Sequence, residues 1–265
     1  MAIGPAQSLL WSEEFADHHG GHLSEDTWNF DIGDGSSAGL VGWGNNELEY
    51  YTKDAINIQN NLVITAQRVP EDSGLHCYYG PAQWTSGKIH TAQKIGFKYG
   101  RIEIKAKMPS GVGTWPALWL LGANLLDGVA WPHCGEIDIL ENTGAHPFQV
   151  QGTIHGDGYF GENGLTKIIQ SPTTLSSDFY SYSINWTPDA IEWFFDDLCY
   201  NTINRVDVEA QGKPWPFNQE FYLIMNLAIG GWFAGDVDPE LKSAELHIAS
   251  ISYYSLDGVG ELILH

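Results

Sequence analysis

One half-buried β-strand is predicted by the stretch RIEIKAKM, residues 101–108. In an extended chain, successive side chains point to opposite faces. Ile102, Ile104, Ala106 and Met108 therefore share one face, and the charged residues between them share the other. This period of two residues is the pattern of a strand that covers a hydrophobic core on one side and meets solvent on the other.

Similar alternating or apolar segments recur along the chain, and clusters of Gly, Pro, Asn and Asp separate them. The further segments are residues 62–66, 115–121, 149–155, 181–187, 191–196, 221–228 and 246–254. No long stretch has helical periodicity, and many strands with few helices favour an all-β sandwich or barrel. We find no linker, repeat or low-complexity run, so we expect residues 1–265 to form a single domain.

The charge of the chain excludes several classes of partner. It carries 33 acidic and 12 basic side chains, a formal net charge of −21. Such a surface repels phosphate backbones and anionic lipid head groups, so we expect no nucleic acid and no membrane as a partner. A neutral polymer would not be repelled, and we expect a monomer. The first residues do not resemble a secretion signal, which leaves a protein that stays inside the cell or one whose signal has been removed.

The three cysteines, Cys77, Cys134 and Cys199, permit at most one internal disulfide. Their spacing does not match a metal site. We expect buried free thiols.

The most informative segment for function is WPHCGEIDILEN, residues 131–142. In a regular strand Glu136, Asp138 and Leu140 share one face, and Glu141 points into the apolar interior. An unpaired carboxylate buried there would be costly. One extra residue in a β-bulge near Leu140 would return Glu141 to the face of Glu136 and Asp138, and bulges are common beside active sites. We therefore predict a bulge.

Two glutamates on one face have the chemistry that glycoside hydrolysis requires. One ionised carboxylate attacks the anomeric carbon, and one protonated carboxyl gives a proton to the leaving oxygen. A retaining enzyme needs the two carboxyls about 5–5.5 Å apart, so both side chains must lean inward, whereas a flat strand would favour inversion or no catalysis. Mutual repulsion between the acids raises at least one pKa and helps to keep the proton donor protonated.

Two other interpretations of Glu136, Asp138 and Glu141 stay open at this point. A chain this acidic can carry a solvated acidic strand face that has no role in catalysis. The acids could also bind calcium, although calcium ligands usually come from a loop and no Asp-, Asn- or Gly-rich loop surrounds them. We rank catalysis first and the solvated face second.

Aromatic residues supply a second feature of a polysaccharide site, because the apolar faces of sugar rings stack on them. Trp115 and Trp119 share a strand face and are the first candidates for sugar contacts. Trp131 and Trp232 follow, in surroundings rich in Gly or Pro. Without the acidic motif, core packing would be the better interpretation of any one of these tryptophans.

Three polar residues are further candidates for the site. Asn45 in GWGNNELEYY and Arg101 could donate hydrogen bonds to sugar hydroxyls, although each could equally be a turn residue or a surface charge. His155 projects with Gln151 from the polar face of residues 149–155 and could orient a catalytic carboxylate. A lone histidine on such a face is usually solvated.

Together these segments resemble the family 16 glycoside hydrolases of the laminarinase type, which are endo-β-1,3-glucanases. The matching segments are WSEEF (11–15), WGNNELEYY (43–51), TSGKI (85–89), YGRIEIKAKMPSGVGTWPALWLL (99–121), WPHCGEIDILE (131–141), GTIHG (152–156) and NLAIGG (226–231). They follow one another across nearly the whole chain. The spacing Glu-x-Asp-x-x-Glu is the bulged form of the family motif.

The resemblance implies a jelly-roll β-sandwich of two antiparallel sheets with a concave substrate cleft. It also implies retaining chemistry with Glu136 as nucleophile, Glu141 as acid/base and Asp138 assisting, and it places His155 near the leaving group. The sugar contacts that it implies are Asn45, Arg101, Trp115, Trp119 and Trp131. We expect no cofactor for catalysis and no metal.

Two positions depart from the family pattern. Ala249 in LHIASISYY occupies the place where many relatives carry an Asp that helps to bind a structural calcium, which weakens the case for calcium. The family's glycine-glycine-x-tryptophan segment is GGWFAG here, so the role of Trp232 is left open.

The expected function is endo-acting, retaining hydrolysis of a β-1,3-glucan such as laminarin, with mixed β-1,3/1,4-glucan as a further substrate. The alternatives are a catalytically silent glucan-binding domain, since jelly-roll sandwiches also serve as lectins, and a transglycosylase on the same site. Intact acids at all three motif positions argue against the silent domain. Because polymeric glucan is too large to enter a cell, we expect the protein to act extracellularly.

Overall fold

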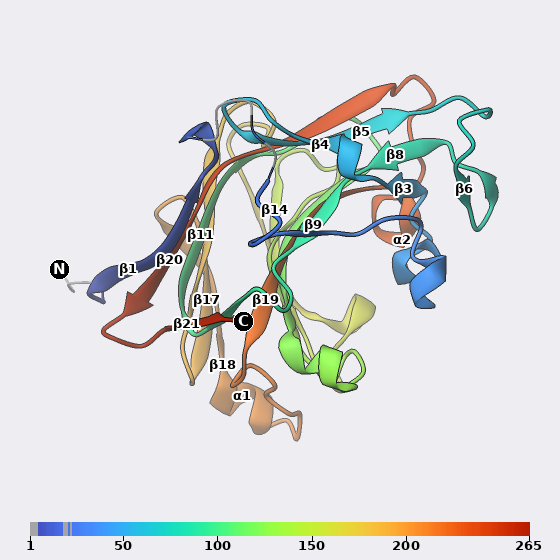
Figure 1. The fold of residues 1–265 in the computed structure, drawn as a ribbon. Helices are drawn as coiled ribbons and strands as arrows, with labels where there is room; N and C mark the ends of the chain where they lie inside the picture. The colour runs from blue at the N-terminus through green and yellow to red at the C-terminus, as the bar shows by residue number, and fades with distance from the viewer. Residues whose placement is uncertain (1–4, 18–20, 22) are drawn as a thin grey trace.

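The computed structural model describes residues 5–17, 21 and 23–265. In this part of the chain the strands form two large sheets that pack face to face (Figure 1). The strand pairs in both sheets are antiparallel, except that β3 (Glu49–Tyr51) and β8 (Trp84–Ser86) run parallel. The expected all-β jelly-roll sandwich is confirmed.

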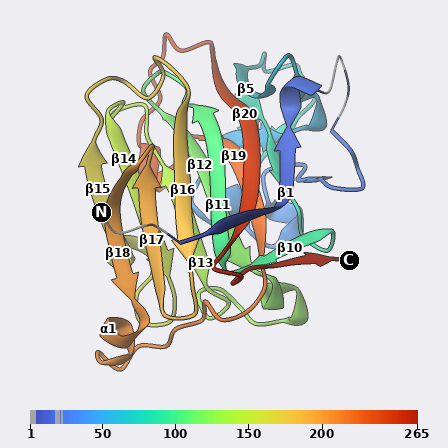
Figure 2. The same ribbon diagram turned by 90° about the vertical axis from the view of Figure 1, so that its left-hand side faces the viewer.

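We name the first sheet the β11 sheet. Its order is β18 (Leu198–Asn204), β17 (Ala190–Phe195), β16 (Tyr180–Trp186), β11 (Gly100–Lys107), β20 (Ser243–Leu256), β5 (Leu62–Arg68), β8 and β3. Two further strands join it, since β1 (Gln7–Glu14) pairs with β20 and β4 (Ile56–Ile58) pairs with β5. Figure 2 looks onto this sheet and shows β11 between β16 and β20.

We name the second sheet the β13 sheet. Its order is β15 (Leu165–Gln170), β14 (Gln149–His155), β13 (Glu136–Glu141), β12 (Thr114–Gly122), β19 (Phe221–Ile229), β10 (Ile95–Lys98) and β21 (Glu261–Leu264). In addition, β9 (Lys88–His90) pairs with β19 and with β2 (Asn29–Phe30). Helix α2 (Gly231–Ala234) lies on the side of this sheet away from the β11 sheet (Figure 1).

Short elements connect the strands. They are the hairpin of β6 (His76–Cys77) and β7 (Gly80–Pro81), helix α1 (Arg205–Glu209), and the 3₁₀ turns η1 (Phe15–Asp17), η2 (Ser36–Ala38), η3 (Val41–Gly44), η4 (Lys53–Ala55), η5 (Ala123–Asp127) and η6 (Gly161–Asn163). Within the described ranges, no helix has the length and apolar content needed to cross a bilayer.

The hydrophobic core lies between the two sheets. Ile102 and Ile104 of β11 and Leu118 and Leu120 of β12 are almost wholly buried in one cluster. Burying a large apolar side chain contributes roughly 1.5–3 kcal/mol, so these facing stripes hold the sheets together. The alternation predicted from the sequence is confirmed in both strands. The side chains between the apolar residues of β12, β13 and β14 therefore point to the outer face of the β13 sheet.

The three cysteines are free thiols. Cys77 and Cys134 are buried, as expected, but Cys199 is exposed. The expectation of burial is wrong for Cys199 because this residue lies on β18, the strand that ends the β11 sheet and leaves much of its surface in solvent.

Candidate active site

A β-bulge interrupts β13 where the sequence predicted one. The register of β13 against both neighbouring strands shifts between Asp138 and Glu141. Ile139 and Leu140, although adjacent in sequence, are both buried in the core. The bulge therefore turns Glu141 to the outer face of the sheet with Glu136 and Asp138, and it avoids the cost of a carboxylate among aliphatic side chains.

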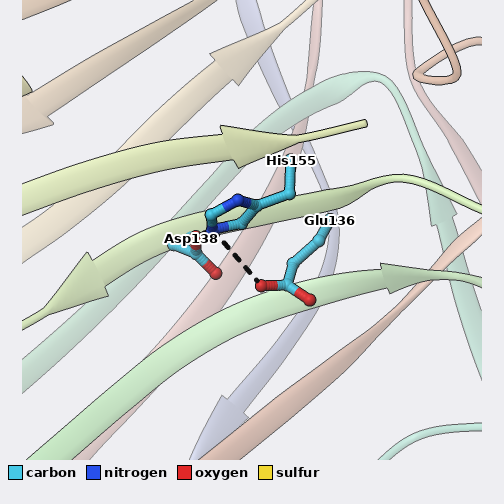
Figure 3. Close-up of side chains that lie close together, drawn as sticks. All are labelled: Glu136, Asp138 and His155. Carbon is cyan, nitrogen blue, oxygen red and sulfur yellow. Dashed lines mark ion pairs between the residues drawn. The ribbon is translucent and has the colours of Figure 1, made fainter. Parts of the chain in front are cut away.

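Glu136, Asp138 and His155 form a compact group on this outer face (Figure 3). His155 Nε2 lies 3.2 Å from Asp138 Oδ2 and 3.7 Å from Glu136 Oε1. The strands bring the group together, because Glu136 on β13 is paired with His155 on β14. The structure thus places His155 beside the acids, as the sequence predicted.

Each of the two glutamates accepts a hydrogen bond from an indole. Trp131 Nε1 donates to Glu136 Oε2 at 2.9 Å, and Trp115 Nε1 donates to Glu141 Oε1 at 3.1 Å. Gln151 Nε2 donates a longer bond of 3.4 Å to Glu141 Oε2. These donors fix the carboxyl groups in one orientation, so the acids are held in place before any substrate arrives.

The acids of this cluster retain protons more strongly than free carboxyls. Burial raises the pKa of Glu136, Asp138 and Glu141 to about 8. For Glu136 and Glu141 the negative charge of Asp138 adds to the effect of burial, whereas His155 and the indole hydrogen bonds lower the pKa. Such a cluster titrates as a unit, so one acid can be protonated while its neighbour is ionised at neutral pH.

Trp119 on β12 forms the surface next to the acids, on the side of β19. Its Nε1 donates to Asn226 Oδ1 at 2.8 Å, and Lys88 Nζ lies 5.5 Å from the centre of its ring. Lys88 is also 3.4 Å from Asp31 Oδ2. Trp115 and Trp119 are both half-buried on the outer face of the sheet, which confirms the shared strand face predicted for them.

Further aromatic rings stand on both flanks of β13. Trp131 is 42% exposed, and its ring lies 5.5 Å from that of Phe160. On the other flank, Phe233 of α2 lies 5.1 Å from Trp115, and Trp232 next to it is 73% exposed. Exposed rings on both sides of the acids suit a chain of sugar units that passes over them.

A pocket of about 250 Å³ opens beside Glu141. Its lining residues are Glu141, Asn142, Thr143, His146, Gln149, Gln151, Ile168 and Phe233. Amide, hydroxyl and imidazole groups next to an aromatic ring can bind the hydroxyls and the apolar face of one sugar unit.

Asn45 reaches the site from the loop that follows η3. Its side-chain amide donates to Glu47 Oε1 at 2.9 Å, and its backbone carbonyl accepts a hydrogen bond from the N–H of Trp232 at 2.9 Å. The structure therefore brings Asn45 and Trp232 together at one edge of the site.

Arg101 lies on the opposite sheet, and the sugar contact predicted for it is wrong for this site. Its guanidinium donates to Glu103 at 2.7 Å and to Asn185 at 3.1 Å, and it lies over the ring of Phe194. These residues are on the outer face of the β11 sheet, so the whole core separates Arg101 from the acids. The alternation in the sequence shows that Arg101 points away from the core. It does not show which of the two sheets contains its strand.

Gln151, Asn226 and Phe233 are site residues that the sequence analysis did not propose. Gln151 was on the predicted polar strand face together with His155, and this shared face was the signal that could have identified it as a site residue. Asn226 is the one polar residue in FYLIMNLAI, the buried strand β19, where an amide needs a partner. Phe233 had no signal in the sequence, because its position follows from the turn that leads into α2.

Glu136, Asp138 and His155 are also, within the described residues, the one group with ligand atoms close enough together to hold a metal ion, all within 4.8 Å of one another. An ion bound there would occupy the oxygens of Glu136 and Asp138. Metal binding would therefore compete with attack by the Glu136 carboxylate, so the group can serve one of these roles but not both.

The comparisons with known proteins agree with this geometry. The sequence profile of glycosyl hydrolases family 16 matches residues 43–249. A β-glucanase of Rhodothermus marinus is 40% identical over 262 residues, which cover 94% of this chain and 86% of that protein. The laminarinase catalytic domain from Thermotoga maritima superposes with a TM-score of 0.88 at 39% identity and covers 94% of this chain and 98% of that chain.

An endo-β-1,3-glucanase from Pyrococcus furiosus is a further structural neighbour. It has a TM-score of 0.88 and 36% identity, and the match covers 95% of both chains. The profile match spans most of the chain and includes the bulged acidic strand and its indole partners. The chain therefore belongs to family 16 of the glycosyl hydrolases.

Proposed function

We propose that this protein hydrolyses β-1,3-glucan at internal bonds, with retention of the anomeric configuration. The observation that carries the proposal is the bulge that sets Glu136 and Glu141 on one face, each held by an indole N–H. The laminarinase and the endo-β-1,3-glucanase among its structural neighbours support the choice of linkage.

In the first step, the Glu136 carboxylate attacks the anomeric carbon of the sugar at the cleavage point. The bond from that carbon to the glycosidic oxygen breaks, and Glu141 donates its proton to the leaving oxygen. Asp138 and His155 lie next to Glu136, and the charge of Asp138 helps to keep Glu141 protonated until this moment. The product is a glycosyl ester on Glu136.

In the second step, Glu141 is ionised and takes a proton from a water molecule. The water oxygen attacks the anomeric carbon from the face that the first product has left, and the bond to Glu136 breaks. Two inversions give net retention, and both acids return to their starting protonation states. No cofactor takes part in either step.

Endo action follows from where the aromatic residues lie. Trp119 stands on one side of the acids, and Trp131 stands on the other with Phe160. Stacking on both sides lets a glucan chain extend past the cleavage point in both directions. A glucan with β-1,4 bonds among its β-1,3 bonds is the further substrate that we propose.

The pocket beside Glu141 favours transglycosylation as a second activity. Its volume accommodates about one sugar unit, and Asn142, Gln149 and Phe233 are among its lining residues. A sugar hydroxyl held there could take the place of water in the second step. Product lengths at a high concentration of a defined β-1,3-gluco-oligosaccharide test this, because transfer yields products longer than the starting oligosaccharide.

The central experiment is product profiling on laminarin, lichenan and carboxymethyl cellulose. We expect reducing ends and a ladder of oligosaccharides from laminarin, a smaller yield from lichenan, and none from carboxymethyl cellulose. Glu136→Gln should abolish cleavage and leave laminarin binding largely intact, whereas Glu103→Gln on the far sheet should behave as wild type. Laminarin binding without any cleavage by the wild-type protein would instead support a silent glucan-binding domain.

We also propose that the protein acts outside the cell, because its polymeric substrate is too large to cross a membrane, and that it is a monomer. Size-exclusion chromatography with light scattering measures the mass in solution, and we expect the mass of one chain, 29.3 kDa. Fractionation of the source cells, with laminarin hydrolysis as the marker, tests the location.

A further inference from the structure

A chain of hydrogen bonds connects Asn45 to Trp119 through the interior of the protein. Asn45 Nδ2 donates to Glu47 Oε1 at 2.9 Å, and Tyr51 Oη donates to Glu47 Oε2 at 3.2 Å. Asn226 Nδ2 donates to Tyr51 Oη at 3.1 Å, and Asn226 Oδ1 accepts from Trp119 Nε1 at 2.8 Å. Two expected sugar contacts from separate parts of the sequence are thereby tied to one carboxylate, that of Glu47.

A second carboxyl lies against the first. Glu47 is 5% exposed and Glu49 is wholly buried, and the charge of Glu47 adds to the effect of burial in raising the pKa of Glu49. A carboxyl that is buried without a counter-charge favours its neutral, protonated form. Glu49 Oε2 already accepts the N–H of Ile229 at 2.7 Å, and Glu49 Oε1 accepts no hydrogen bond from the described residues. Oε1 is therefore the oxygen of Glu49 that is free to carry a proton.

The charged groups around Glu47 and Glu49 can stabilise one ionised carboxylate but not two. Among the described residues, Lys88 is the one cation that lowers the pKa of Glu47, and it also pairs with Asp31. The other titratable groups that interact with the pair or with its neighbours are Tyr51, Cys77, Tyr78, Tyr79 and Asp34. Each of these is neutral or negative, so a second carboxylate would be buried without a counter-charge. Burial raises the pKa of Glu47 and raises that of Glu49 further.

We propose that Glu47 is a positioning residue, which holds Asn45 and Trp119 as one fixed sugar-binding edge, and that its buried neighbour Glu49 stays neutral. The inference rests on the proposed function for the role of this edge. A neutral Glu49 leaves Glu47 as the one carboxylate of the pair. Neither acid touches the reacting atoms, so Glu47 acts on substrate affinity and Glu49 acts on stability, rather than on bond cleavage.

The role of Glu49 has a pH dependence whose sign follows from the raised pKa. A group whose pKa is higher in the folded protein than in the unfolded chain adds stability at low pH and loses it as the pH rises. Wild-type stability should therefore fall from about pH 5 upward, partly because of Glu49. In Glu49→Gln, the amide oxygen can still accept from the N–H of Ile229, and the titration is removed.

The first measurement is urea unfolding of wild type and Glu49→Gln between pH 5 and pH 9. The catalytic acids are present in both proteins, so their effect cancels in the comparison. We expect the urea midpoint of Glu49→Gln to exceed that of wild type by a margin that grows with pH. A margin that stays constant or shrinks as the pH rises would overturn the neutral state of Glu49, and this result does not depend on any substrate.

The second measurement is the kinetics of laminarin hydrolysis at pH 6. We expect Glu47→Gln to raise KM about tenfold with kcat within twofold of wild type, and Glu49→Gln to leave both unchanged. Tyr51→Phe breaks the same chain while keeping the carboxyls, so it covers the case in which Glu47→Gln does not fold, and it should raise KM several-fold. Glu103→Gln is the control.

An unchanged KM in both Glu47→Gln and Tyr51→Phe, or a fall in kcat without a change in KM, would overturn the positioning role. Failure of the wild-type protein to cleave laminarin would overturn the proposed function instead.

Discussion

Replacing Asp138 by Asn tests the electrostatic coupling inside the acid cluster. Asp138 is almost wholly buried, with its Oδ2 3.2 Å from His155 Nε2, and an asparagine keeps its shape and an acceptor oxygen for His155. Its negative charge helps to raise the pKa of both Glu136 and Glu141. Without that charge, each glutamate loses its proton more easily, and both pKa values should fall.

The size of the effect follows from the distances. The Glu136 and Asp138 oxygens lie within 4.8 Å of each other. At an effective dielectric constant of about 20, two unit charges this far apart interact by about 3.5 kcal/mol, which corresponds to about 2.5 pKa units. Asp138 itself carries a proton for part of the pH range, so the charge that is removed is less than one. We expect shifts of about 1–2 pH units.

The assay is the pH dependence of kcat/KM on laminarin from pH 4 to pH 10, which reports the acid and the base of the free enzyme. Both limbs of the profile should move to lower pH in Asp138→Asn, whether or not the maximal kcat/KM changes. The matched control is Asp207→Asn on α1, an exposed aspartate whose loss should leave the profile unchanged. Limbs that stay within about 0.3 units of wild type, or that move to higher pH, would refute the coupling.

Four further predictions follow from the same geometry. Trp115→Phe removes a hydrogen bond that lowers the pKa of Glu141, so the alkaline limb of the same profile should move up by about 0.5–1 unit, and a downward shift would contradict the contact. Glu136→Gln removes an acid whose pKa is raised to about 8, so its stability advantage over wild type should grow between about pH 5 and pH 8, to about 3 kcal/mol by chemical unfolding. Arg101→Ala should leave KM and kcat within about twofold of wild type, because its side chain lies on the far sheet, and a large rise in KM would place substrate there. Dialysis against EDTA should leave laminarin hydrolysis unchanged, and loss of activity restored by a metal would replace the carboxylate mechanism with a metal site.

The acidic strand could be predicted from sequence in detail because two physical rules conflicted there. Period-two alternation put Glu141 in the core, and the cost of a buried carboxylate forbade it, so a bulge was the remaining solution. The alternation of β11, β12 and β14 was equally clear, since each strand has one apolar and one polar face. These features depend on local sequence alone.

The features that the sequence did not reveal depend on how distant segments meet. Arg101 has the pattern of an outward-facing strand residue in either sheet, and only the strand order decides which groove it lines. Phe233 reaches the site because a turn after β19 brings α2 over Trp115. The acid pair of Glu47 and Glu49 has the alternation of an ordinary polar strand face, and its burial follows from β19 packing against it.

The bulge in β13 also has a consequence for how this enzyme could be altered. The nucleophile and the acid/base both come from a single strand that is paired with a neighbour on either side, so their spacing is built into the backbone of the scaffold. The loops that border the groove contribute rings and amides but set none of that spacing. Loop exchange should therefore change which polysaccharide is accepted while the cleavage machinery keeps its shape.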